Sequence, residues 1–195
     1  QSNQSPGGTV GGNLIVNVLG NGVQIYGYES TEILGVSDNL VEDAAGYGIY
    51  VDNTTSTPGT TIADNSIAGA SSAGIYLNSA NGSPFTVTGN GVRDGTGDGI
   101  YVYASQSGGG TVEGNEVADV PYDGIYVEGY SSSAGFLVAG NQVWNVGGYF
   151  SYGIYLNAND AGTPSTVSGN DFAGPAWVGI HVNASGSSGQ DPASR

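Results

Sequence analysis

Apolar and polar residues alternate along this chain in short stretches that return at a nearly constant interval. The clearest stretch reads Gly-Ile-Tyr-Val at residues 48–51, and related stretches begin at residues 74, 99, 124, 153 and 179. Alternation with a period of two is typical of a β-strand that has one face in the core. The Ile and Val are therefore predicted to point inward, and the residue between them outward.

An asparagine marks every interval. The intervals between successive marker asparagines are 26, 26, 25, 25, 26 and 29 residues, and the markers are Asn13, Asn39, Asn65, Asn90, Asn115, Asn141 and Asn170. An aliphatic residue stands three positions before each marker and an apolar residue two positions after it. A fixed interval of this size predicts a solenoid in which each repeat forms one coil.

Each repeat contains three short alternating stretches separated by Gly, Asn, Asp and Ser, and none has a helical period. This pattern predicts an all-β fold, a parallel β-helix of about seven coils with three short strands per coil. We expect a single array over residues 8–184, a polar lead-in at 1–7 and a flexible polar tail at 185–195.

The marker asparagine is predicted to lie at a tight bend between the first two strands. Gly usually precedes it, as suits a left-handed conformation, and Asp38 and Asp64 replace that Gly in two coils. Stacked asparagine side chains would bond to the coils on either side and satisfy buried bend backbone. We therefore expect a structural asparagine ladder, and we attribute the Gly of Gly-Ile-Tyr-Val to a bend as well.

The pattern Val-x-Gly-Asn-x-Val followed by Gly-Ile-x-Val resembles the right-handed parallel β-helix repeat. Pectate lyases, polygalacturonases, mannuronan epimerases and NosD-like periplasmic proteins share this repeat. The resemblance covers roughly residues 8–184 and implies the fold, but the fold hosts many activities. In enzymes of this superfamily, the strand that matches Gly-Ile-Tyr-Val forms the outer wall of the polysaccharide cleft.

The composition excludes some classes of binding partner. The 195 residues include no Cys, Met or Lys, and the formal net charge is -15. Nucleic acid is excluded as a partner because phosphate contacts need clustered Lys or Arg. Membrane insertion is excluded because no apolar run is long enough to span a bilayer. A chain without Lys, Cys or Met suits an extracellular or cell-surface setting.

The outward residue of the repeated strand is the first candidate for a contact surface. It is tyrosine in five consecutive coils, with Gln24 before them and His181 after them; the five are Tyr50, Tyr76, Tyr101, Tyr126 and Tyr155. At ~4.8 Å per coil they would form a continuous strip. The strip would serve either as a platform for sugar rings or a protein partner, or as cross-strand stacking that stabilises the sheet.

Acidic pairs precede the repeated strand in two neighbouring coils, Asp94 with Asp98 and Asp119 with Asp123. Stacked like charges are unfavourable unless something neutralises them. A bound Ca²⁺ would do so. Alternatively, the loops are splayed and solvated, or one carboxyl has a raised pKa. Two carboxylates about 5 Å apart also match retaining glycosidases, although nothing else in the sequence supports that reading.

The longest bend, from Val143 to Gly153, carries an aromatic group that predicts a ligand or partner site. Its members, with one residue from the next coil, are Trp144, Tyr149, Phe150, Tyr152 and Trp177. The alternative is a loop that folds its aromatic side chains against the end of the rod.

Catalytic residues are hard to assemble from this sequence. Arg93 and His181 lie three coils apart, about 14 Å along the axis, which is too far for one proton-transfer site. The Asp-Pro-His-Glu motif of mannuronan epimerases and the paired basic residues of pectate lyases are absent. No cofactor is required, although Ca²⁺ remains a candidate.

The ends of the array lack the amphipathic helix that usually caps this fold, because the flanking segments are polar. Either the chain is part of a larger protein, or its open ends meet other subunits head to tail. The sequence favours a non-catalytic extracellular structural or surface protein that self-associates into a fibre. The alternative is a polysaccharide-binding or polysaccharide-modifying module that uses the tyrosine face.

Overall fold

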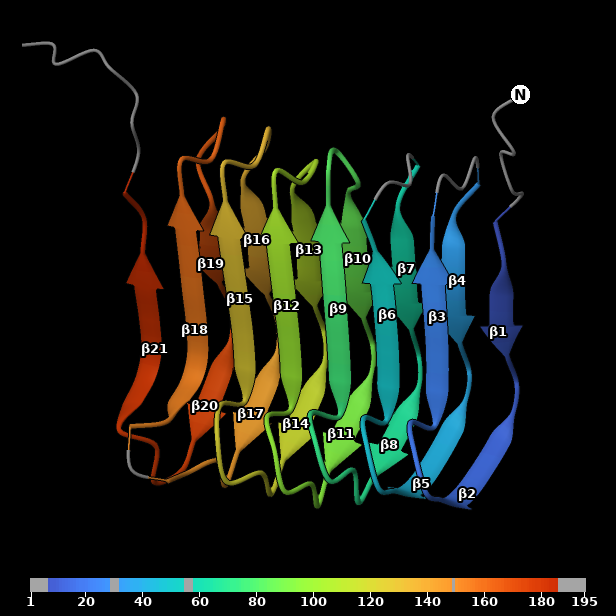
Figure 1. Ribbon diagram of the computed structural model, residues 1–195. Coiled ribbons are helices and arrows are strands. Elements are labelled where there is room, and N and C mark those ends of the chain that lie inside the picture. The colour runs from blue at the N-terminus through green and yellow to red at the C-terminus, as the bar shows by residue number, and fades with distance from the viewer. Residues whose placement is uncertain (1–6, 29–31, 55–57, 149, 186–195) are drawn as a thin grey trace, which may run out of the picture.

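The computed structural model describes residues 7–28, 32–54, 58–148 and 150–185. These residues form 21 β-strands and no helix. The strands make three parallel sheets of seven strands each, and each coil of the chain contributes one strand to every sheet (Figure 1). The predicted all-β parallel β-helix is confirmed.

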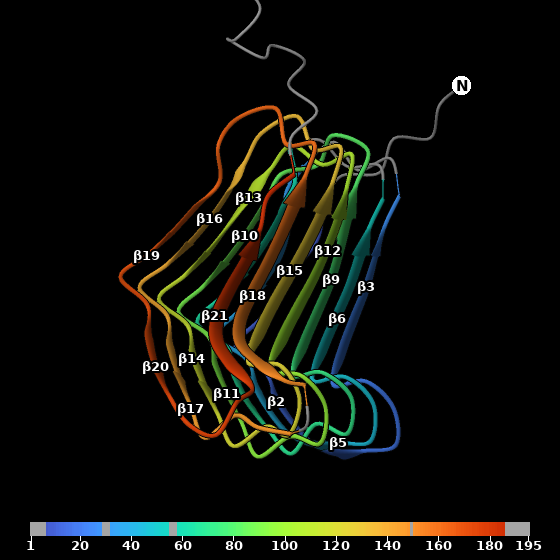
Figure 2. The same ribbon diagram turned by 90° about the vertical axis from the view of Figure 1, so that its left-hand side faces the viewer.

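The three sheets form the three sides of the rod, which Figure 2 shows obliquely from the C-terminal end. The first sheet contains β1 (Thr9–Gly11), β4 (Leu34–Ser37), β7 (Thr60–Ala63), β10 (Phe85–Thr88), β13 (Gly110–Glu113), β16 (Phe136–Ala139) and β19 (Thr166–Ser168). The second contains β2 (Leu14–Val18), β5 (Leu40–Ala44), β8 (Ser66–Ala68), β11 (Gly91–Arg93), β14 (Glu116–Ala118), β17 (Gln142–Trp144) and β20 (Asp171–Ala173). The third contains β3 (Val23–Gly27), β6 (Ile49–Asn53), β9 (Ile75–Ala80), β12 (Ile100–Ser105), β15 (Ile125–Tyr130), β18 (Tyr152–Asn159) and β21 (Val178–Asn183).

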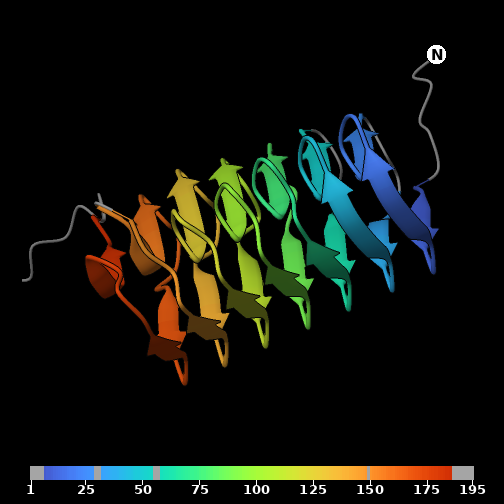
Figure 3. The same ribbon diagram turned by 90° about the horizontal axis from the view of Figure 1, so that it is seen from below.

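Equivalent residues of successive coils lie side by side. In the third sheet, for example, Tyr101 pairs with Tyr76 on one side and with Tyr126 on the other. The coils therefore stack as separate layers along the rod, as the view from below shows (Figure 3). Every position of the repeat becomes a column that runs parallel to the rod axis.

The core follows the predicted alternation. In β12, Ile100 and Val102 are fully buried while Tyr101 between them is only half-buried. The same holds in the neighbouring strands of the third sheet, so the apolar columns of the three sheets meet in one continuous core. The predicted inward and outward residues of Gly-Ile-Tyr-Val are confirmed.

The asparagine ladder is also present. The Asn90 amide nitrogen donates to Oδ1 of Asn115 and to the carbonyl of Ile62, both at 3.0 Å. The Oδ1 of Asn90 accepts from the backbone N–H of Asn65 at 3.0 Å and from the side-chain amide of Asn65 at 2.9 Å. Each ladder amide thus joins three coils, and Asn90 is 0% exposed.

The bend before the ladder has the predicted left-handed backbone. The residue that precedes each marker has a φ between 55° and 68°, for example 65° at Gly89 and 56° at Asp38. Gly adopts this conformation freely, and Asp tolerates it better than most residues do. The two Asp replacements are therefore compatible with the same bend.

The Gly that opens the repeated strand has a different cause from the one expected. Gly99 lies at a bend, as predicted, but its φ is not positive, so a left-handed conformation is not what requires Gly there. A Cβ on Gly99 would instead lie 2.3 Å from Cγ1 of Val117 and 2.5 Å from the carbonyl oxygen of Gly124. Close approach between the bend and the core of the next coil requires Gly in this column.

The first and last coils leave inward residues uncovered. Ile180 and Val182 are 43% and 49% exposed, whereas their register partners Ile154 and Leu156 are fully buried. The predicted lead-in and tail lie largely outside the described residues. Within the described part of the chain, no helix has the length and apolar composition needed to cross a bilayer.

Replacement of Asn90 by Ala is expected to destabilise the fold by about 3 kcal/mol. The change leaves the Asn65 N–H without its acceptor and removes the amide donor to the Ile62 carbonyl in a dry interior, and each unsatisfied group costs about 1–3 kcal/mol. Urea unfolding measures the effect. Asn170→Ala is the matched control because Asn170 ends the ladder and is only half-buried; equal losses for the two variants would contradict the ladder's role.

Candidate functional site

The five tyrosines of the repeated strand form a tyrosine column on the outward face of the third sheet. Their rings stack on one another with interplanar angles of 6° to 14°. Successive centroids lie 5.2, 5.5, 4.9 and 4.6 Å apart, and His181 stacks on Tyr155 at 5.2 Å and 2°. The predicted cross-strand stacking is present.

This stacking decides what the tyrosine column presents to solvent. Each interior ring has a neighbouring ring over both faces, so only its edge and hydroxyl point outward. Such pairs stabilise a sheet by about 0.5–1.5 kcal/mol each beyond their buried area. A sugar ring cannot lie flat on an interior tyrosine, and any ligand of this face meets ring edges and hydroxyl groups.

A second outward column, the polar column, runs beside the tyrosines two residues further along each strand. Its members lie in register on neighbouring strands and are Asp52, Asn78, Tyr103, Glu128 and Asn157. Sequence reasoning missed these residues because they vary in type from coil to coil. The alternation that placed the tyrosines outward also places these residues outward, so the signal was available.

Glu128 links the two columns. The hydroxyl of Tyr101 donates to one carboxylate oxygen of Glu128 at 3.1 Å, and the hydroxyl of Tyr130 donates to the other at 2.5 Å. Burial, followed by the negative charge of Glu128, raises the pKa of the Tyr101 phenol, and the same two causes raise the pKa of Tyr126. These phenols therefore stay protonated and act as hydrogen-bond donors.

A third column, the flank column, consists of the residue just before the Gly of each repeated strand. Its members are Tyr47, Ala73, Asp98, Asp123 and Tyr152. Tyr47 packs against Tyr50 and Tyr76, with both centroid distances 5.3 Å. Tyr152 packs in the same way against Tyr155 and His181, at 4.9 and 5.3 Å. The two ends of the tyrosine column thus carry an extra ring at the side.

A groove of about 400 Å³ opens where the flank column is small. At positions 73 and 98 the flank column carries no aromatic side chain, and the sides of Tyr76 and Tyr101 line the groove. Tyr47 bounds this groove in one direction along the rod, and Tyr122, which is 61% exposed, bounds it in the other. The structure therefore places ring edges, a carboxyl group and an exposed tyrosine side chain around one hollow.

Asp98 and Asp123 are neighbours in the flank column. Oδ1 of Asp98 accepts the backbone N–H of Asp123 at 2.9 Å, and Oδ1 of Asp123 accepts the backbone N–H of Tyr152 at 2.6 Å. Burial raises the pKa of Asp98, although its hydrogen bond opposes the shift. Burial also raises the pKa of Asp123 to about 6, opposed by its own hydrogen bond and helped by the Asp98 charge. Of the alternatives to a bound Ca²⁺ at the acidic pairs, a carboxyl group with a raised pKa is therefore the one that this environment favours.

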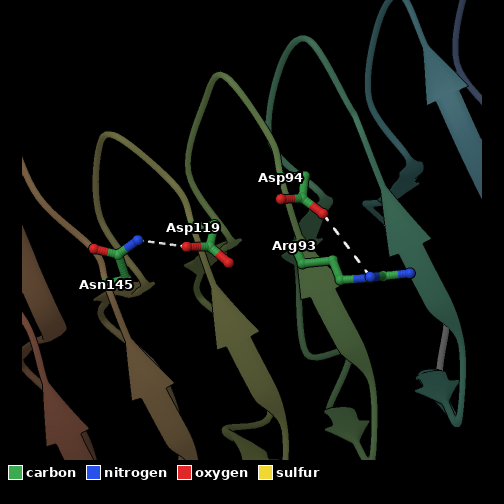
Figure 4. Close-up of polar contacts among 4 residues, drawn as sticks. All are labelled: Arg93, Asp94, Asp119 and Asn145. Carbon is green, nitrogen blue, oxygen red and sulfur yellow. Dashed lines mark hydrogen bonds and ion pairs between the residues drawn. The ribbon is translucent and has the colours of Figure 1, made fainter.

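The other two predicted acidic residues, Asp94 and Asp119, lie at the bend that follows the second sheet (Figure 4). Asp94 and Asp119 have φ values of 56° and 54°, so their main requirement is a left-handed bend. Asp94 forms an exposed ion pair with Arg93 at 4.0 Å, and Asp119 accepts the side-chain amide of Asn145.

The four aspartates consequently do not meet at one point. Within the described ranges, no group of three or more His, Cys, Asp or Glu side chains is arranged to hold a metal ion. The Ca²⁺ site remains a prediction, and the Asp98–Asp123 pair is the only part of it that the structure brings together.

The predicted aromatic loop is only partly assembled. Phe150 and Trp177 are in contact, with ring centroids 5.5 Å apart, and are 71% and 65% exposed. Trp144 belongs to the second sheet, where it pairs with Ala118 and Ala173, so it does not share the tyrosine face. Tyr149 lies outside the described residues.

The two basic residues considered for catalysis are on different sides of the rod. Arg93 ends β11 in the second sheet, and His181 is in β21 in the third. The expectation that they do not form one proton-transfer site agrees with this placement.

Comparison with known families and structures gives the class of protein. A family model described as a right handed beta helix region matches residues 2–84 and 21–190, and the chain belongs to this family. The handedness and the superfamily indicated by the repeat are thereby confirmed. No curated protein sequence matches the chain.

Two solved structures have a similar fold. A double mutant of the periplasmic alginate epimerase AlgG aligns with a TM-score of 0.59 and 20% identity, over 91% of this chain and 40% of that one. The A-module of the mannuronan C-5 epimerase AlgE4 from Azotobacter vinelandii aligns with a TM-score of 0.50 and 16% identity, over 94% and 59%. The chain thus spans about half the length of these proteins, and at such identities the likeness shows the fold alone.

Asp123→Asn is expected to change how stability depends on pH. The folded-state pKa of about 6 lies above the ordinary 3.8, so the protonated acid is favoured by folding. That stability is fully present below about pH 4 and is lost as the pH rises through about 6. The amide keeps an acceptor for the Tyr152 N–H but cannot ionise.

Thermal melting by circular dichroism at about pH 4 and about pH 7.5 checks this expectation. The Asn variant should melt higher than the native chain at the upper pH, with a smaller difference at the lower. Asp171→Asn removes the same charge at an exposed position and serves as the control. Parallel pH profiles for all three proteins would refute the role assigned to Asp123.

Proposed function

We propose that this protein binds a polysaccharide along the outward face of its third sheet. The observation that carries the proposal is the groove between Tyr47 and Tyr122, with Tyr76 and Tyr101 along its floor and Asp98 at its side. It is a place on the third sheet where the regular surface becomes concave, and small-molecule sites are concave with a few polar groups among apolar ones.

The dimensions of this groove suit an extended chain. Neighbouring coils are spaced at ~4.8 Å, so a hollow lined by residues of four successive coils spans three spacings, or roughly 15 Å. The polar column continues on either side of it with the same spacing. A linear polymer lying along the rod axis therefore meets similar groups again in each coil.

The similar structures support this direction. Both are named as epimerases of alginate or mannuronan, which are polysaccharides. One is described as periplasmic, and we place this protein outside the cytoplasm as well, in line with its lack of Cys and Lys. The proposal stops at binding because the carboxyl groups of Asp98 and Asp123 already accept backbone hydrogen bonds.

End-to-end assembly is a second candidate function, which the exposed ends of the asparagine ladder favour. Each ladder residue donates its N–H to the amide oxygen of the next coil, as Asn141 does to Asn170 at 2.9 Å. Among the described residues, the N–H of Asn170 and the Oδ1 of Asn13 have no such partner. One end therefore offers a donor and the other an acceptor, and a second copy placed head to tail would join them.

Ala73→Tyr tests the binding function directly. Tyr47 and Tyr152 occupy the same column and pack beside the stacked rings, so a tyrosine at position 73 is expected to fill the groove without unfolding the chain. Isothermal titration against the best ligand from a glycan array should show affinity reduced at least about tenfold, or 1.4 kcal/mol. The melting temperature should stay unchanged.

Two tyrosine-to-alanine variants, one at the end of the groove and one away from it, form a matched pair for the same binding test. Tyr122→Ala removes a groove residue that is 61% exposed and should weaken binding, whereas Tyr28→Ala removes one that is 70% exposed but does not line the groove. Equal binding by all three variants, or no binding to any polysaccharide by the native chain, would rule out the groove as the site.

Val182→Glu tests assembly. This inward residue of the last coil is 49% exposed, and a second copy would bury it. Sedimentation velocity over a range of concentrations should show species longer than one rod for the native chain and single rods for the variant. Thr166→Glu adds the same charge at an exposed outward position of the same coil and should assemble normally. Single rods for the native chain at every concentration would dispose of assembly.

A further inference from the structure

The ionisable side chains on the face around the groove are almost all acidic. Asp98 lines the groove, and Asp52, Asp123 and Glu128 lie on the same face in neighbouring coils. The sequence contains no lysine. Arg93 lies on the second sheet and pairs with Asp94. Within the described part of the third sheet, the only basic side chain is His181 in the last coil.

Two members of the polar column have a side-chain oxygen without a hydrogen-bond donor. The side-chain amide nitrogen of Asn78 donates to Asp52 at 3.0 Å, while its Oδ1 has no partner. Oδ1 of Asn157 also has no partner, although this residue is only 5% exposed. Buried polar atoms are normally hydrogen-bonded.

A polyuronate fits these groups poorly. Its carboxylates need cationic donors such as Arg or Lys, which pair with them in charge-assisted hydrogen bonds. Here every carboxylate of the ligand would face a surface that is itself anionic. Sugar hydroxyls, in contrast, donate hydrogen bonds to carboxylates and amide oxygens without adding charge, and the apolar C–H groups of the sugar can contact the tyrosine ring edges.

We propose that the groove and the polar column select an uncharged, hydroxyl-rich polysaccharide and reject polyuronates. This inference rests on the proposed polysaccharide-binding function and narrows it to one chemical class. Hydroxyl groups of the ligand donate to Asn78, Glu128 and the neighbouring acceptors. The sugar rings run past the edges of Tyr76 and Tyr101 and end against Tyr122.

A pair of polymers that differ only in charge tests the selection. Alginate and carboxyl-reduced alginate have the same linkages, but reduction converts each carboxylate into an uncharged hydroxymethyl group. Isothermal titration or affinity electrophoresis of the native chain should give binding of the reduced polymer that is at least about tenfold tighter. Added salt should improve the weak binding of alginate and leave that of the reduced polymer unchanged, because screening removes the repulsion.

Two isosteric variants connect the selection to named residues. Asp98→Asn keeps the acceptor for the Asp123 N–H, as Asn21, the residue before Gly22 in the first coil, does for the Tyr47 N–H. Glu128→Gln removes the second charge. Both should narrow the gap between the two polymers by improving alginate. Asp171→Asn, on the second sheet, should leave the gap as it is.

The outcomes separate the two levels of the proposal. If alginate binds as tightly as its reduced form, or binds only when Ca²⁺ is added and is released by a chelator, the inference fails while polysaccharide binding stands. If neither polymer binds but a neutral galactan or mannan does, with polygalacturonate rejected, the inference stands. If no polysaccharide binds at all, the proposed function fails and the selection with it.

Discussion

Parallel stacking of one coil on the next, in fixed register, is the constraint on which the rest of this molecule depends. A bend that turns the chain inward leaves backbone groups buried, and the asparagine ladder satisfies them through bonds to the coils before and after. Because the ladder residue recurs at the same bend, it also fixes how far each coil can slip along its neighbour. A slip by one residue would exchange inward and outward side chains over the whole sheet.

Fixed register has a consequence for the surface. It converts any outward residue that recurs in the repeat into a column with one member per coil. The tyrosine column, the polar column and the flank column all arise in this way on the third sheet. A coil that departs from the usual residue of a column then changes the shape of the surface. Where Ala73 and Asp98 replace the tyrosines found at 47 and 152, the same architecture yields a groove.

Periodicity was sufficient to predict the fold, because the ladder asparagines and the inward Ile and Val recur at one spacing. It could not predict which surface the tyrosines expose. That depends on ring planes, and the parallel stacking at about 5 Å covers the faces that a sugar platform would need. The four aspartates were treated as one group since Asp94 and Asp98 are close in sequence. The bend between them separates a left-handed corner residue from one that faces the groove, a distinction that backbone angles reveal and residue types do not.

The acidity of the chain has a physical cost that bears on its ligand. Stacked columns bring equivalent side chains to about 5 Å, so like charges in one column repel unless they are solvated, paired or protonated. The structure shows two of these solutions within one coil: Asp119 is paired with an amide, and burial raises the pKa of Asp123 to about 6. On a surface whose carboxyl groups already repel one another, an anionic ligand would add further repulsion. The same electrostatics that shape the flank column therefore favour a ligand that brings hydrogen-bond donors and no carboxylates.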